Sequence, residues 1–193
     1  MIPRNDYMVR ATALDGLVRA FAIDSTATVA ELRRRHATDP AVTAALGRLA
    51  TGTLLFGAML KDEDQLVTVR VQGNGPAGTL LASANGNGEV RGLVSNPRPD
   101  VEQVNDRGKL NVSGVVGTEG RLTVTRDLGM RQPHTSTVEL VWGPGHEADG
   151  STATVGIEDQ LGEAATQIGF NTAGATPAGT SLLLAPASPL AQH

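Results

Sequence analysis

Residues 39–60, DPAVTAALGRLATGTLLFGAML, hold the strongest fold signal in the sequence. Asp39 followed by Pro40 is typical of a helix start, because a short polar side chain can cap the first turn and proline is tolerated at the first helical position. Core-type side chains then recur every three or four residues, which predicts a long helix with one face in a core. These side chains are Val42, Leu46, Leu49, Thr53, Phe56 and Leu60.

Gly52 and Gly57 lie inside this predicted helix. Each costs roughly 1 kcal/mol relative to alanine in a helix interior. We therefore expect another backbone segment to pack closely against the helix at both positions.

The sequence before this helix predicts a β-hairpin and a shorter helix. Residues 8–13 and 17–23 are joined by Asp15-Gly16, a dipeptide that supplies the positive φ angles of tight hairpin turns. Ser25 or Thr26 is then a candidate N-cap. The core side of the shorter helix is expected to hold Val29, Leu32 and His36, with Arg33, Arg34 and Arg35 mostly facing away.

The sequence after the long helix predicts strands. Residues 66–71 alternate with period two, and residues 79–83 and 89–94 flank Asn85-Gly86-Asn87-Gly88, a strong hairpin signal. Further short strands are predicted at residues 109–112, 121–126 and 135–141. Because the helices do not alternate with the strands, the predicted fold class is α+β, with an N-terminal β-hairpin, two helices and then a multi-stranded, largely antiparallel sheet region.

The distribution of charge suggests a boundary near residue 143. All sixteen lysines and arginines lie between Arg4 and Arg131, whereas residues 143–193 hold five acids and neither lysine nor arginine. We expect residues 1–142 to form the core domain and residues 143–193 to form a Gly/Pro-rich tail, a composition that buries little. A helix over residues 157–168 and a strand over residues 180–184 would let the tail complete the core; whether the tail is ordered stays open.

Composition excludes several function classes. The net charge is −4 and there are five aromatic residues, which argues against nucleic-acid binding. The absence of cysteine removes disulfides, thiolate zinc sites and thiol catalysis. No secretion signal begins the sequence and no apolar run approaches the ~18 residues of a membrane span. We expect a soluble, cytoplasmic protein that binds neither nucleic acid nor membranes.

The sequence contains one glycine-rich motif that could bind a nucleotide. Residues 73–78, GNGPAG, fit G-x-G-x-x-G and follow a predicted strand. However, another strand rather than a helix follows, so the motif is expected to be a structural turn. Neither Lys61 nor Lys109 lies in a P-loop, and no serine lies in G-x-S-x-G. We therefore predict no catalytic residues, no cofactor-binding residues and no enzymatic activity.

Charged clusters give little support for a metal or anion site. Asp62-Glu63-Asp64 is expected to be a solvated turn, and His146-Glu147-Ala148-Asp149 to offer at most an adventitious metal contact. The arginines at 33–35 with Arg48 are interpreted as a solvated helical face, with a phosphate or acidic partner as the alternative. No metal ligand is predicted.

A series of short segments carries a family resemblance. They include Asp6-Tyr7-Met8-Val9-Arg10-Ala11, Arg34-Arg35-His36, Ala44-Ala45-Leu46-Gly47-Arg48-Leu49, Gln72-Gly73-Asn74-Gly75-Pro76, Asn96-Pro97, Gly108-Lys109-Leu110 and Leu122-Thr123-Val124-Thr125-Arg126-Asp127-Leu128-Gly129. In this order, over residues 6–142, the sequence resembles the 33 kDa chaperonin family, the redox-regulated heat-shock protein 33 holdases.

The resemblance implies a chaperone core without the family's switch. Family members hold zinc through a C-x-C and a C-x-x-C pair, and this sequence has no cysteine. We expect an ATP-independent holdase that binds unfolded client proteins through exposed apolar surface, without zinc or a redox switch. An inert or assembly-only remnant of the core is the alternative. The client-binding residues, a homodimer, and a truncated, divergent or altered origin of the chain stay open.

Overall fold

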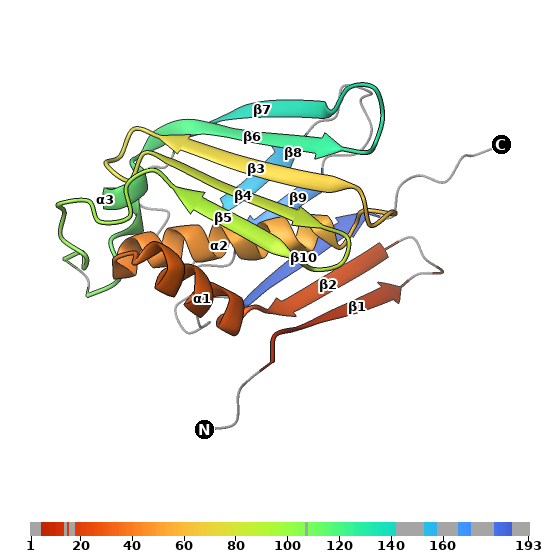
Figure 1. The fold of residues 1–193 in the computed structure, drawn as a ribbon, viewed down its shortest axis with the longest axis horizontal. Helices are drawn as coiled ribbons and strands as arrows, with labels where there is room; N and C mark the ends of the chain where they lie inside the picture. Colours follow the sequence, from red (N-terminus) through yellow and green to blue (C-terminus); the bar gives the residue numbers. More distant parts are fainter. Residues whose placement is uncertain are drawn as a thin grey trace.

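Figure 1 shows the fold in the computed structural model, which describes residues 5–13, 15, 18–106, 108–141, 153–157, 166–170 and 180–186. A hairpin comes first and two helices follow; the remaining elements are mostly strands. The elements are β1 (Tyr7–Ala13), β2 (Val18–Asp24), α1 (Thr26–His36), α2 (Pro40–Gly57), β3 (Leu66–Gly73), β4 (Thr79–Asn85), β5 (Val90–Val94), α3 (Val112–Val116), β6 (Glu119–Asp127), β7 (His134–Val141), β8 (Ala153–Ile157), β9 (Thr166–Phe170) and β10 (Thr180–Pro186). The α+β class and this element order agree with the sequence prediction.

The largest sheet is antiparallel and has the strand order β5-β4-β3-β6-β7. One of its faces packs on α2, which runs beneath it in Figure 1. Period-two alternation along these strands places valine, leucine and alanine on this inner face. The buried inner residues are Val67, Val69, Leu80, Ala82, Ala84, Leu122 and Val124.

Helix α2 is buried over most of its surface, not along one face alone. Gly57 explains one close approach, because an added Cβ there would lie 2.6 Å from the backbone oxygen of Asn85. A Cβ added at Gly47 would lie 2.7 Å from a methyl group of Val29 on α1. The expectation at Gly57 is therefore confirmed, and Gly47, which the sequence analysis did not single out, is where α1 packs on α2. The helix ends at Gly57, three residues before the predicted end.

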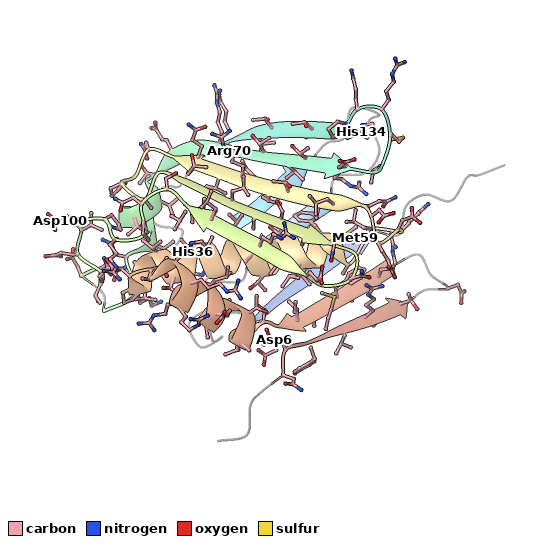
Figure 2. The ribbon with its side chains drawn as sticks, in the orientation of Figure 1. Asp6, His36, Met59, Arg70, Asp100 and His134 are labelled. Atoms are coloured by element: carbon pink, nitrogen blue, oxygen red, sulfur yellow. The ribbon has the colours of Figure 1, made fainter. Side chains whose placement is uncertain are left out.

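The start of α1 is held by a residue that the sequence analysis did not consider. Ser25 is the N-cap, but its side chain makes no capping hydrogen bond. Instead, the carboxylate of Asp6 accepts hydrogen bonds from the backbone N–H groups of Ala27 and Thr28, each 2.7 Å long. Figure 2 shows Asp6 where β1 begins, beside α1. This carboxylate links the hairpin to the helix.

The predicted hairpin is present, and a distant strand extends it. Strand β2 pairs with β1 on one side and with β10 on the other, in the order β1-β2-β10. The strand predicted at residues 180–184 therefore lies within β10 and joins the hairpin sheet.

The helix predicted over residues 157–168 is wrong at both of its ends. Ile157 closes β8 and residues 166–168 belong to β9, and these two strands pair with each other; residues 158–165 lie outside the described residues. Threonine, valine and isoleucine at the strand positions favour extended backbone.

The strand predicted over residues 109–112 is also wrong. Leu110 forms only an isolated bridge with Val104, and Val112 opens the five-residue helix α3. Asn111 caps that helix, because its side-chain oxygen accepts a hydrogen bond from the N–H of Gly114. An asparagine before a short apolar run is a helix-start signal that outweighs the β-propensity of valine.

Candidate functional site

The glycine-rich loop at residues 73–78 is a structural turn. Gly75 and Ala77 donate backbone hydrogen bonds to the carbonyl oxygens of Val116 and Val115. The side-chain oxygen of Asn74 accepts a further one from the N–H of Thr118, 3.0 Å away. The strand β4 follows directly, so no helix N-terminus is available to hold a pyrophosphate. The loop's hydrogen bonds anchor α3 to the sheet.

The acidic run at residues 62–64 lies exposed after α2, as the sequence predicted. The side-chain amide of Gln65 donates a hydrogen bond to the carboxylate of Asp62 at 2.7 Å. Among the residues that the structure describes, no group of three acids or histidines is placed to hold a metal ion. Residues 146–149 lie outside the described part of the chain.

The arginines of α1 form an exposed, partly paired face. Glu31 accepts hydrogen bonds from Arg34 at 2.7 Å and from Arg35 at 2.6 Å. These two hydrogen bonds lower the pKa of Glu31 to about 2. Arg48, by contrast, is half-buried in α2. The structure adds Arg98, whose Nε donates a hydrogen bond to the carbonyl oxygen of Ala37. Both residues line a shallow groove, together with Arg33 and Arg34.

The face of the large sheet opposite α2 is open in the described part of the chain, and we call it the outer sheet face. Its most apolar positions are Leu66 on β3, Leu81 on β4 and Leu93 on β5, which we call the outer leucines. Leu66 is 41% exposed and Leu93 is 54% exposed, and Leu81 pairs directly with Leu93 across the strands. Leu66 lies towards the other end of this face, where its register partners are Asn85 and Asp127, so the outer leucines are a pair and a separate residue, each an exposed apolar contact point.

Hydroxyl groups line much of the remainder of the outer sheet face, together with charged side chains such as Arg91, Arg121 and Glu139. Hydroxyl oxygens of neighbouring strands lie within hydrogen-bond distance, which satisfies part of this polar surface without burying it. The pairs are Thr68 with Ser83 at 2.8 Å, Thr123 with Thr137 at 3.1 Å and Thr125 with Thr135 at 3.1 Å. Arg70 also lies on this face, where its register partners are Leu81 and Thr123.

Sequence reasoning found no candidate client-binding residues and did not single out the outer leucines. Each lies on a different strand, at a position that alternation alone assigns only to one of two faces. Knowledge of which face α2 covers is needed to assign the other face to solvent. Apolar residues at neighbouring positions of β4 and β5 point to opposite faces, and they were the one sequence signal that the outer face carries apolar side chains.

No helix in the described residues is long and apolar enough to span a membrane.

Comparisons with known proteins agree on one family. The family model of the Hsp33 protein matches residues 6–148. The 33 kDa chaperonins of Bacillus licheniformis and Bacillus subtilis are 50% and 51% identical to the chain over 138 residues. That match covers 72% of this chain and 47% of each relative, so the chain spans about half the length of these curated relatives.

A solved structure shows the same fold. The crystal structure of the 33 kDa chaperonin (heat shock protein 33 homolog) from Thermotoga maritima superposes with a TM-score of 0.70 at 26% identity, and the match covers 94% of this chain and 61% of that one. The family match, the curated relatives and the fold thus support one assignment, and the chain belongs to the Hsp33 family of chaperonins.

Proposed function

We propose that this chain is an ATP-independent holdase that binds unfolding proteins through exposed apolar surface and lacks the redox switch. The observation that carries the proposal is the set of outer leucines, exposed on a sheet face in a chain of a chaperonin family. A holdase needs only passive apolar contact, and the glycine-rich loop supplies no phosphate cradle that would favour a nucleotide-driven cycle. Unfolded client proteins are the proposed partners.

The lack of a switch is proposed from the absence of cysteine in these 193 residues. A reagent shifts a two-state equilibrium only if it interacts differently with the two states. Without thiols, mild oxidant has no group here that would form a disulfide or release zinc. We therefore expect equal activity under reducing and mildly oxidising conditions.

An inert or assembly-only remnant of the core is the second candidate function. The length of the match favours considering it, because the chain corresponds to about half of its curated relatives. On this alternative the outer sheet face binds no client.

Aggregation of a heat-unfolding client, followed by light scattering at a stated ratio of chain to client, tests the two candidates. Suppression that is equal in dithiothreitol and in mild peroxide supports the holdase, and failure in both supports the inert core. Activation by peroxide contradicts the proposal. Because Met130 is 54% exposed, a Met130→Leu variant in parallel identifies any effect of oxidising this methionine.

Paired variants then test the outer sheet face. Replacing Leu66 and Leu93 together with serine should reduce suppression severalfold, because both side chains are exposed on the proposed surface. The matched control replaces Val104 and Leu110, which are 48% and 40% exposed away from the sheet, with serine. Equal loss in both double variants would show that the outer sheet face has no special role.

A further inference from the structure

The edge of the hairpin sheet differs from the edges of the large sheet. Strand β1 pairs only with β2 among the described residues, so seven residues present one row of unpaired backbone groups. Proteins usually protect such edges with proline, lysine, bulges or covering helices, because an open edge is a template for another strand. The sequence of β1, YMVRATA, has no proline and no lysine, and its pairing with β2 runs without a bulge.

Both edges of the large sheet carry protection that β1 lacks. Edge strand β5 is short, with five residues, carries the exposed Arg91, and packs its inner face against α1, where a Cβ added at Gly92 would be 3.1 Å from a methyl group of Leu32. Edge strand β7 follows Pro133 and is largely polar, with Thr135, Thr137 and Glu139 exposed. The open, apolar edge in this comparison is β1.

The side chains of β1 give the edge an apolar outward face. Tyr7 is 62% exposed and Val9 is 53% exposed, and their partners on β2 are Asp24 and Ala22. The next residue on this face, Ala11, is exposed as well. The opposite face is tied to the core, because the Arg10 guanidinium lies 5.9 Å from the ring centre of buried Phe21.

We propose that the edge of β1 binds an extended apolar segment of a non-native polypeptide as an added strand. This inference rests on the proposed holdase function and assigns a second contact to it. Backbone hydrogen bonds would supply affinity without regard to sequence, and Tyr7 and Val9 would favour apolar side chains at alternate positions. A chaperone that meets many clients needs this kind of sequence-tolerant contact.

Charge argues against a second copy of this chain as the occupant. In a symmetric antiparallel pair of β1 strands, all seven residues pair only in the register that places Arg10 opposite Arg10. Like charges directly opposite each other destabilise a strand pair. Shifting the register to avoid this contact shortens the ladder. A foreign segment with a glutamate or an apolar residue opposite Arg10 has no such penalty.

Binding of a defined peptide to the full chain tests the inference. The probe is a fluorescent nine-residue peptide of alternating valine and threonine with glutamate at its centre, and the readout is fluorescence anisotropy. We expect saturable binding that is lost when three consecutive central amides of the peptide are N-methylated, because this removes donors on both edges of the strand. Equal binding of the N-methylated peptide would overturn the inference.

Variants of the chain locate the contact. Val9→Lys places an edge-protecting lysine on the outward face and should weaken binding at least tenfold. Met130→Lys, at a residue of matching exposure, should leave binding unchanged. Arg10→Glu should reverse the preference between the glutamate-centred peptide and a lysine-centred one, a result that loss of folding could not produce. The proposal is contradicted if Val9→Lys leaves peptide binding unchanged and Arg10→Glu does not reverse the preference between the two peptides.

Two further measurements separate the alternatives. Sedimentation should show no dimer that depends on the β1 edge. A dimer of the unmodified chain that Val9→Lys dissociates would assign the edge to a second copy and overturn the inference. Client aggregation assayed with the same samples distinguishes the two proposals. If Val9→Lys suppresses client aggregation as well as the unmodified chain does, the edge of β1 is not the contact, and the holdase function stands. If the unmodified chain does not suppress aggregation, the holdase function is rejected, and the peptide assay alone decides whether the edge binds a strand.

Discussion

The large sheet and the hairpin sheet differ in how far apart in the sequence their strands lie. The large sheet takes all its strands from residues 66–141, and its inner face is buried on α2. The hairpin sheet joins β1 and β2 to β10, so Val18 lies opposite Pro186. Closing such a long loop costs more entropy than closing a short hairpin, although the cost rises slowly with length. The large sheet is therefore assembled from one stretch of the chain, whereas the hairpin sheet combines a local hairpin with a strand from far along the sequence.

The largest expected effect is at the interface between α2 and the large sheet. Leu46 is 1% exposed and packs beneath β5, so Leu46→Ala should lower the free energy of unfolding by about 2–5 kcal/mol. Denaturant titration measures the change. Leu93→Ala, on the exposed side of the same strand, should change it by less than about 0.5 kcal/mol. Similar values for both variants would remove the distinction between the two faces.

A smaller effect is expected where α2 holds the segment between the hairpin and α1. The hydroxyl of Thr51 donates to the carbonyl of Gly47 at 2.7 Å, which leaves Ser25 to donate to Thr51, also at 2.7 Å. Thr51→Val removes the hydrogen bond between these two buried hydroxyls and should cost about 1–3 kcal/mol. Thermal unfolding measures it, with Thr137→Val on the outer sheet face as the exposed control. A neutral Thr51→Val would show that the hydrogen bond between the two hydroxyls adds no stability.

A local effect on the hairpin is expected at Asp6. Asp6→Ala removes both carboxylate contacts to the start of α1 and should cost about 1 kcal/mol. Hydrogen exchange should accelerate in β1 and at the amides of Ala27 and Thr28, while β3 keeps its protection. Asp6→Asn, which retains one acceptor oxygen, should give an intermediate result. Uniform acceleration throughout the chain would show that the two sheets unfold as one unit.

The smallest effect is expected at the exposed charge cluster of α1. Hydrogen bonds from Arg34 and then Arg35 hold the pKa of Glu31 at about 2, below its ordinary value of 4.5. Because the folded pKa is the lower one, the stabilising contribution is complete above pH 4.5 and is lost as the pH falls towards 2. The difference in melting temperature between the unmodified chain and Glu31→Gln should therefore shrink over that range.

Salt provides the control for this last prediction. Exposed ion pairs are screened by solvent and by ions, so high salt should reduce the difference at neutral pH as well. A difference that grows as the pH falls would contradict the assigned direction of the pKa shift.

Local patterns in the sequence were sufficient for most of the core. Asp39-Pro40 and the spacing of Val42, Leu46 and Leu49 indicated α2, and Asp15 in the hairpin turn has the positive φ of 54° that its Asp-Gly context predicted. Period-two alternation gave β3, and the Asn-Gly repeats gave the turn between β4 and β5. These features depend on residues close together in the chain.

The errors arose where short segments gave weak or competing signals. Residues 109–112 alternate polar and apolar side chains, as a strand does, but the cap at Asn111 and the contacts of Val115 and Val116 with the loop before β4 favour a short helix. Apolar residues three and four apart over residues 157–168 suggested a helix, whereas Ile157 and Ile168 lie in paired strands. Pairing partners decide such segments, because a short apolar run fits either structure.

Local spacing and matching residues in order were enough to predict the α+β class, the hairpin, the two helices and the family from the amino-acid sequence. Only the tertiary structure decided which sheet face α2 covers, that Asp6 holds the start of α1, and that β10 pairs with β2 while β1 stays at the edge. The outer leucines and the open edge follow from those placements. The physical reason is that burial and strand pairing depend on contacts between residues far apart in the chain, which local propensity does not encode.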